Sequence, residues 1–117
     1  FTSAGHNEAF LYRKRQEEMI PLKTRGKFLG IFAENSWEED EFPVQAGDRI
    51  VLYTDGITEM VNHQGEEFGL DRFMDLIRLS KNLDLVSAKN FVVSNILNFE
   101  NTEYINDDKA FIIIDIT

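Results

Sequence analysis

The sequence predicts an α+β domain in which a mainly antiparallel sheet carries helices packed on one face. Short segments rich in β-branched and aromatic residues are separated by turn residues, as they are in β-hairpins. Two longer segments within residues 70–99 instead repeat their apolar residues with helical spacing. The chain then closes on a continuous apolar run of strand length. These three observations together favour hairpins first, helices next and one last strand.

The composition fits one compact domain. The chain has 117 residues, of which 43% are hydrophobic and ten are Phe, and this is enough for a core. A net charge of −9 argues against nucleic acid or an anionic membrane as a partner. The absence of Cys excludes a disulfide framework, a thiolate zinc site and a cysteine nucleophile. No apolar run approaches the roughly 20 residues of a membrane span, so we expect a cytoplasmic domain without direct membrane contact.

The first hairpin is expected near the start of the chain. Its strands are Ala9–Arg13 and 18–20, joined by a charged turn and closed by Pro21. A loop of small residues with His6 precedes it. The imidazole of His6 titrates near neutrality and suits a ligand or acid-base role, whereas the alternative is a hydrogen bond that stabilises the loop.

A second hairpin is expected between residues 37 and 54. Residues 37–44 read as an exposed edge strand whose four consecutive carboxylates prevent pairing with other chains. A turn at 45–48 then leads into the strand 50–54, which is rich in β-branched and aromatic residues.

This second strand stops at Asp55 and Gly56. A carboxylate at a strand end is held by rigid structure yet faces outward, and Gly56 would leave open space and permissive backbone angles beside it. Such a position suits Mg²⁺ or Mn²⁺, which prefer oxygen ligands. The alternative is an Asp-Gly turn that only closes the strand.

Helices are expected after a short helical turn at 57–61. Each has an apolar face with the spacing of residues that share one side of a helix, and Asp84 occupies the N-cap position of the second. The first face contains Leu70, Phe73, Met74 and Ile77, and the second contains Leu85, Ala88, Val92, Ile96 and Phe99.

The last strand is expected over residues 111–114. Its continuous apolar run indicates that both faces are covered, and Asp107 and Asp108 directly precede it. The strand that ends at Asp55 and the strand that follows Asp107 and Asp108 have ends that can meet at one rim of the sheet. Carboxylates brought together without a cation repel one another, so such a meeting would favour a metal.

The order of several motifs resembles one known family. Ser-Ala-Gly-His-Asn at 3–7, Phe-Leu-Gly-Ile at 28–31, Gly-Asp-Arg-Ile-Val-Leu-Tyr-Thr-Asp-Gly-Ile-Thr-Glu at 47–59, Glu-Glu-Phe-Gly at 66–69 and Asn-Asp-Asp at 106–108 are similar to motifs of the SpoIIE/RsbU-like serine phosphatases. These bacterial enzymes belong to the PPM superfamily, whose members include protein phosphatase 2C. The resemblance covers residues 1–117, which correspond to the C-terminal half of the family's domain.

The resemblance implies part of an α-β-β-α sandwich and a binuclear Mn²⁺ or Mg²⁺ phosphatase in which metal-activated water attacks a phosphoserine. By match to the family's motifs, Asp55 and Asp107 would be metal ligands. Asp108 would support the site through a hydrogen bond, and Gly56 and His6 would be further supporting residues. Paired cations lower the pKa of water and neutralise charge on the phosphoryl oxygens, so no protein nucleophile is required.

Two departures from the family pattern stand out. A Gly-Asp-aromatic-aromatic-Asp motif that supplies further metal ligands is absent, and the chain begins at Phe1 without Met, so we expect a fragment of a longer domain. At 109–110 the sequence has Lys-Ala, where the family usually has an apolar residue and Thr. Lys109 would either face solvent or weaken metal binding by its charge.

The resemblance also implies a role in bacterial partner-switching signalling, with phosphoserine on a small anti-sigma-factor antagonist protein as the substrate. We expect the chain alone to bind metal weakly, to hydrolyse little and to associate with itself through uncovered sheet. The alternative function is a non-catalytic, phosphatase-like module that binds a signalling partner.

Overall fold

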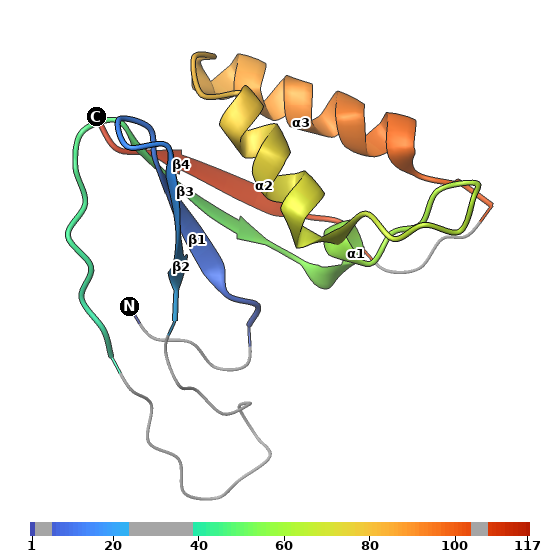
Figure 1. Cartoon of the computed structure of the whole chain (residues 1–117), viewed down its shortest axis with the longest axis horizontal. Coiled ribbons are helices and arrows are strands. Elements are labelled where there is room, and N and C mark those ends of the chain that lie inside the picture. Colours follow the sequence, from blue (N-terminus) through green and yellow to red (C-terminus); the bar gives the residue numbers. More distant parts are fainter. Residues whose placement is uncertain (2–5, 24–38, 104–107) are drawn as a thin grey trace, which may run out of the picture.

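The computed structural model describes residues 1, 6–23, 39–103 and 108–117, and it has the predicted α+β architecture. Four antiparallel strands form one sheet in the order β2-β1-β3-β4. Helices α2 and α3 lie together on one face of this sheet (Figure 1). The strands are β1 (Ala9–Arg13), β2 (Glu18–Leu22), β3 (Asp48–Tyr53) and β4 (Phe111–Asp115). The helices are α1 (Asp55–Thr58), α2 (Gly69–Leu79) and α3 (Leu85–Phe99).

The first hairpin is confirmed. Strand β1 pairs with β2 over five residues, from Ala9 opposite Leu22 to Arg13 opposite Glu18. The return strand was predicted to end at Pro21, but β2 continues through this proline to Leu22. Because β2 is at the edge of the sheet, the missing N–H of this proline is tolerated there.

The second hairpin was predicted wrongly in the part that the structure describes. Residues 39–45 run as irregular chain up to the turn before β3, and residues 37 and 38 lie outside the described residues. Pro43 offers no N–H for a ladder, and the Arg13 side chain binds this segment instead. The Arg13 guanidinium donates to the carbonyl oxygen of Pro43 at 2.8 Å and lies 5.5 Å from the centroid of the Phe42 ring.

Helices α2 and α3 cover the sheet through the apolar faces read from the sequence, with exceptions at their first turns. Phe73, Ile77, Ala88, Val92 and Ile96 are buried as predicted, whereas Leu70 and Leu85 are exposed. Asp84 caps α3 as predicted, since its carboxylate accepts the backbone N–H of Ser87 at 2.8 Å. No helix in the described part of the chain is both long and apolar enough to cross a membrane.

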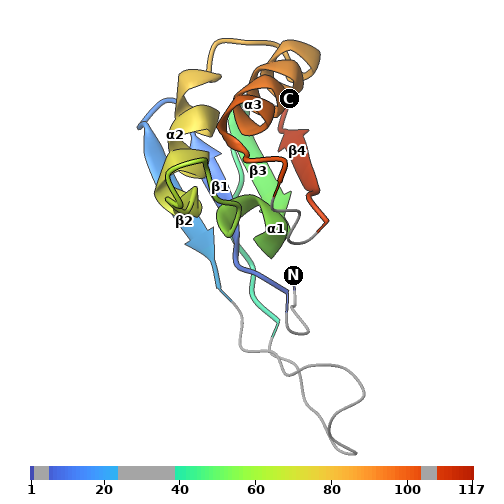
Figure 2. The same ribbon diagram turned by 90° about the vertical axis from the view of Figure 1, so that its right-hand side faces the viewer.

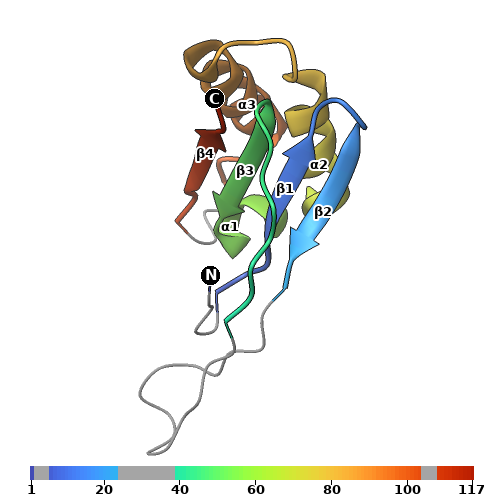
Figure 3. The same ribbon diagram turned by 90° about the vertical axis from the view of Figure 1, so that its left-hand side faces the viewer.

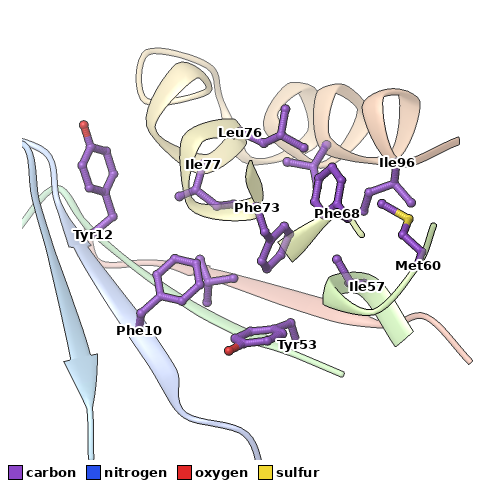
Figure 4. Packing of buried hydrophobic residues seen from close by; sticks show 12 residues of the cluster. Phe10, Tyr12, Tyr53, Ile57, Met60, Phe68, Phe73, Leu76, Ile77 and Ile96 are labelled. Atoms are coloured by element: carbon purple, nitrogen blue, oxygen red, sulfur yellow. The ribbon is translucent and has the colours of Figure 1, made fainter. Parts of the chain in front are cut away.

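The core lies between the sheet and these helices (Figure 4). Phe73 of α2 is fully buried and stands edge-on to the rings of Phe10 in β1 and Tyr53 in β3, with centroid distances of 6.0 and 5.4 Å. A further ring, Phe111 at the start of β4, lies 6.1 Å away. Three strands are thus joined to one helix by the same aromatic side chain.

The other face of the sheet is open along β4, which corrects the prediction that both faces of the last strand are covered. Ile112 and Ile114 of β4 point to this face and are 58% and 44% exposed. The segment 39–47 crosses the same face over β1 and β3 (Figure 3). It borders a hollow of about 660 Å³ lined by Leu11, Ile50 and Leu52 of the sheet and by Phe42 and Val44 of the segment, among others. The apolar run therefore predicts a strand, but it does not show that other elements pack on both faces of that strand.

A buried cation joins the helical layer to the sheet. The Arg49 side chain in β3 is fully buried and donates to both carboxylate oxygens of Asp115 in β4, at 2.6 and 2.8 Å. It also donates to the carbonyl and hydroxyl oxygens of Ser80, both at 3.2 Å, and to the carbonyl oxygen of Leu83 at 3.2 Å. The link between α2 and α3 is thereby fixed on the sheet, and the hydrogen bonds from Arg49 lower the pKa of Asp115.

Candidate acidic site at one end of the sheet

Asp55 lies where β3 ends, but the turn there is helical. Thr54 is the N-cap of α1 and Asp55 is its first residue, with an exposed side chain. A carboxylate in the first turn is stabilised by the unpaired N–H groups of a helix start. Gly56 is buried inside α1, and the described glycines with positive φ are Gly47, Gly65 and Gly69. The alternative of an Asp-Gly turn that only closes the strand is therefore wrong, and Gly56 does not use the backbone angles that glycine alone adopts readily.

Asp108 lies at the same end of the sheet because Thr54 pairs with the segment that leads into β4. The Thr54 N–H donates to the carbonyl oxygen of Ala110 at 3.0 Å, and the Ala110 N–H donates to Thr54 Oγ1 at 3.0 Å. The same hydroxyl donates to the carbonyl oxygen of Asp108, again at 3.0 Å. The structure thus brings together two segments separated by more than fifty residues, one beginning with Asp55 and the other containing Asp108.

Asp107, the second predicted ligand, lies outside the described residues. It is covalently joined to Asp108, whose side chain is exposed at this end. Metal binding by Asp55 and Asp107 stays a prediction, as does the supporting role of Asp108.

His6 lies just before β1, which starts at the sheet end where β3 finishes. Its side chain is exposed, and its Nδ1 donates to the carbonyl oxygen of Asn7 at 2.8 Å. This bond is of the kind that stabilises a loop, the alternative left open above. His6 also lines the hollow on the open face, whereas Asp55 and Asp108 lie outside its described lining.

The charge of Lys109 is compensated inside the protein. Its Nζ lies 2.5 Å from a carboxylate oxygen of Glu100, at the end of α3, and both side chains are largely buried. Lys109 therefore does not simply face solvent. The ion pair draws its positive charge toward the helix and connects the Asp108 segment to α3.

The electrostatic environment of this end is negative. The pKa of Tyr53 is raised, mainly by burial of its hydroxyl group, and the negative charges of Asp55 and Glu8 raise it further. Asp55 in α1 and Glu8 just before β1 thus act on one phenol. Carboxylates that lie near one another in this way attract divalent cations.

Two residues of the site were missed by sequence reasoning. Thr54 reads as the last residue of a strand, and Glu100 as the residue after a helix. Their partners in the last segment are 56 and nine positions away, and neither pair carries a local sequence signal.

The carboxylates at this end are ligands of the type that Mg²⁺ and Mn²⁺ bind, but the described residues provide too few of them for a complete site. Carboxylates are the ligands that these ions prefer. Within residues 1, 6–23, 39–103 and 108–117, however, no group of three or more His, Cys, Asp or Glu side chains is arranged to hold a metal ion. The described residues would therefore supply part of a metal site.

Comparisons with known proteins identify the family of the chain. The family model described as stage II sporulation protein E (SpoIIE) matches residues 1–117. Phosphoserine phosphatase RsbU of Bacillus subtilis is 32% identical over 65 residues, which are 56% of this chain and 19% of that protein. Protein IcfG of Synechocystis sp. is 26% identical over 77 residues, or 66% of this chain and 12% of that protein.

A solved structure shares the fold. The SiaA-PP2C domain of Pseudomonas aeruginosa superposes with a TM-score of 0.75 and 20% identity. The match covers 94% of this chain but 43% of that one. The chain thus spans less than half of this neighbour and about a fifth or less of the two curated relatives.

Proposed function

Since this chain belongs to the SpoIIE family, within the RsbU-like phosphatases of the PPM superfamily, we propose that it is the C-terminal portion of a metal-dependent protein serine phosphatase domain. The single observation that carries the proposal is the pairing of Thr54 with Asp108 and Ala110, which sets two acidic segments side by side. The longer domain that would contain this portion is called the complete domain below.

In the proposed site Asp55 and Asp107 would hold Mn²⁺ or Mg²⁺, and Asp108 would support them. When bound, two such ions lower the pKa of water and neutralise charge on a phosphoryl group. The remaining ligands would come from elsewhere in the complete domain, because the described residues supply only part of the donor set.

The chain's own residues would orient the site. The start of α1 holds the exposed Asp55 carboxylate at the end of β3. Glu100 holds Lys109 at 2.5 Å, and this limits competition between the ammonium group and bound cations. Neither Asp55 nor Asp108 needs to act as a nucleophile in this scheme.

For the substrate we propose phosphoserine on a small bacterial signalling protein of the anti-sigma-factor antagonist type. RsbU, described as a phosphoserine phosphatase, supports the phosphoserine part of this proposal. Proteins of this signalling type act on transcription, and the proposed reaction would therefore take place in the cytoplasm.

A chelation experiment on the complete domain tests the proposed function. Turnover of p-nitrophenyl phosphate and of a phosphoserine peptide is expected to disappear when EDTA removes divalent ions, and to return with Mn²⁺ or Mg²⁺. This chain alone, assayed beside it, should hydrolyse neither compound because its donor set is partial. Metal-loaded complete domain that turns over neither compound would contradict the proposal and favour the non-catalytic partner-binding module.

We also propose that this chain, when produced alone, associates through the open face of its sheet. Light scattering should then give a mass above the 13.6 kDa of one chain. Ile112→Lys, which places a charge on that face, should restore the monomer, whereas Leu79→Lys on the exposed surface of α2 should not. A wild-type chain that stays monomeric at high concentration would contradict this expectation.

A further inference from the structure

The hydroxyl of Thr54 occupies an unusual place in the hydrogen bonding at the acidic end. Regular pairing of β3 with β4 ends at Tyr53 opposite Phe111, so the next pair along the ladder is Thr54 and Ala110. The Thr54 N–H makes the expected bond to the Ala110 carbonyl oxygen, at 3.0 Å. The return bond from the Ala110 N–H goes to Thr54 Oγ1 and not to a backbone carbonyl.

The reason is that the Thr54 carbonyl oxygen has another partner. It accepts the N–H of Ile57 at 3.1 Å, within the first turn of α1. The chain therefore leaves the sheet and starts a helix at the same residue. The hydroxyl replaces the carbonyl in the ladder, and its proton is directed to the Asp108 carbonyl oxygen at 3.0 Å, with the Ala110 carbonyl oxygen farther away at 3.4 Å.

This use of the side chain differs from ordinary capping. A threonine at an N-cap normally accepts an N–H of its own helix, and losing that bond costs about 1 kcal/mol. The Thr54 side chain makes no such capping bond. Its hydrogen-bonding capacity is directed across to the segment that contains Asp108.

We propose that Thr54 is a positioning residue that fixes the segment containing Asp108 relative to Asp55. This inference rests on the proposed function, because the placement of Asp108 relative to Asp55 matters only if this end of the sheet holds bound cations. Asp55 follows Thr54 directly in the chain, and the carbonyl oxygen of Asp108 accepts a hydrogen bond from the Thr54 hydroxyl. Thr54 therefore sets how the two acidic segments meet, and we call its bonds to Asp108 and Ala110 the Thr54 clamp.

The test compares two substitutions in the complete domain. Thr54→Val keeps the shape and β-branching of threonine but removes the hydroxyl, whereas Thr54→Ser keeps the hydroxyl. Calorimetric titration with Mn²⁺ should show about 10- to 100-fold weaker binding for Thr54→Val, the range found when groups that orient metal ligands are removed. Thr54→Ser should bind Mn²⁺ as the wild type does.

Amide hydrogen exchange at Ala110 gives a second readout that needs no metal. Its N–H donates to Thr54 Oγ1, so exchange should be faster in Thr54→Val and unchanged in Thr54→Ser. Asp84→Ala is the matched control, since it removes a cap remote from the site and costs about 1 kcal/mol of stability. It should leave both Mn²⁺ binding and exchange at Ala110 unchanged.

The outcomes separate this inference from the proposed function. Wild-type Mn²⁺ affinity in Thr54→Val would overturn the positioning role, and so would unchanged exchange at Ala110. Equal loss of Mn²⁺ binding in Asp84→Ala would overturn it too, by assigning the effect to general destabilisation. Failure of the proposed function has a different signature, because the wild-type domain itself would then take up no Mn²⁺, while faster Ala110 exchange in Thr54→Val would still uphold the clamp.

Discussion

Arg49→Ala is expected to lower the free energy of unfolding of this chain by about 3–5 kcal/mol, the range for breaking a buried ion pair from one side. The Arg49 guanidinium is fully buried and donates to Asp115, Ser80 and Leu83. Its removal leaves a partly buried carboxylate and two carbonyl oxygens without these donors, and it opens a cavity under the link between α2 and α3. Urea denaturation followed by circular dichroism measures the difference.

The matched control is Arg78→Ala. Arg78 forms an ion pair with Asp75 at 2.5 Å on the surface of α2, where both side chains are exposed. Exposed pairs contribute at most about 1 kcal/mol, so this variant should remain close to the wild type. Equal losses in the two variants would show that the buried network has no special role in holding the helices on the sheet.

At acidic pH, the free energies of unfolding of the wild type and of Arg49→Ala should differ by less than they do at neutral pH. The hydrogen bonds from Arg49 lower the pKa of Asp115 in the folded state, so the stabilisation is present above the ordinary aspartate pKa. It is lost as the pH falls through the lowered folded value and Asp115 takes up a proton. Repeating the denaturation along a pH series checks this sign, and a difference that widens in acid would contradict the assigned ion pair.

Asp55→Asn is expected to reduce phosphatase turnover of the complete domain by on the order of a hundredfold or more, since a metal ligand contributes several kcal/mol of transition-state stabilisation. Asparagine keeps the size of the side chain but removes its charge, and Asp55 is exposed at the first position of α1, so folding should be retained. Steady-state hydrolysis of p-nitrophenyl phosphate at saturating Mn²⁺ measures the loss.

Asp75→Asn provides the control, because it makes the same change in charge at an exposed position on α2. Its turnover should equal that of the wild type. If Asp55→Asn also keeps full turnover, Asp55 is not a ligand and the acidic end of the sheet is not the site of the reaction.

Local sequence signals predicted the parts of this fold that depend on neighbours in the chain. The strand before Asp55, the first hairpin and the Asp84 cap follow from side-chain alternation, turn residues and a capping bond within three residues. The apolar run of β4 correctly predicted a strand, but the prediction that both of its faces are covered was wrong. The number of layers on a strand depends on what packs against the whole sheet, and residues 111–114 do not encode that.

The candidate site could be predicted only as a set of separate acidic residues. Asp55 was chosen from its place at a strand end and, with Asp107, from the family motifs. That the end of β3 meets the segment of Asp108 depends on Thr54 bonding to residues 54 and 56 positions away. Arg49 was equally hidden, since its partner Asp115 is 66 positions distant. A charged residue in a strand reads as exposed until the strand carrying its partner is known to lie beside it.

The most direct test of the proposed metal site is an anomalous difference map from crystals of the complete domain soaked in Mn²⁺. We expect two peaks about 4 Å apart, the usual spacing of two-metal sites, with the carboxylates of Asp55 and Asp107 among their ligands. Mn²⁺ bound elsewhere, with Asp55 and Asp107 both directed into solvent, would contradict it.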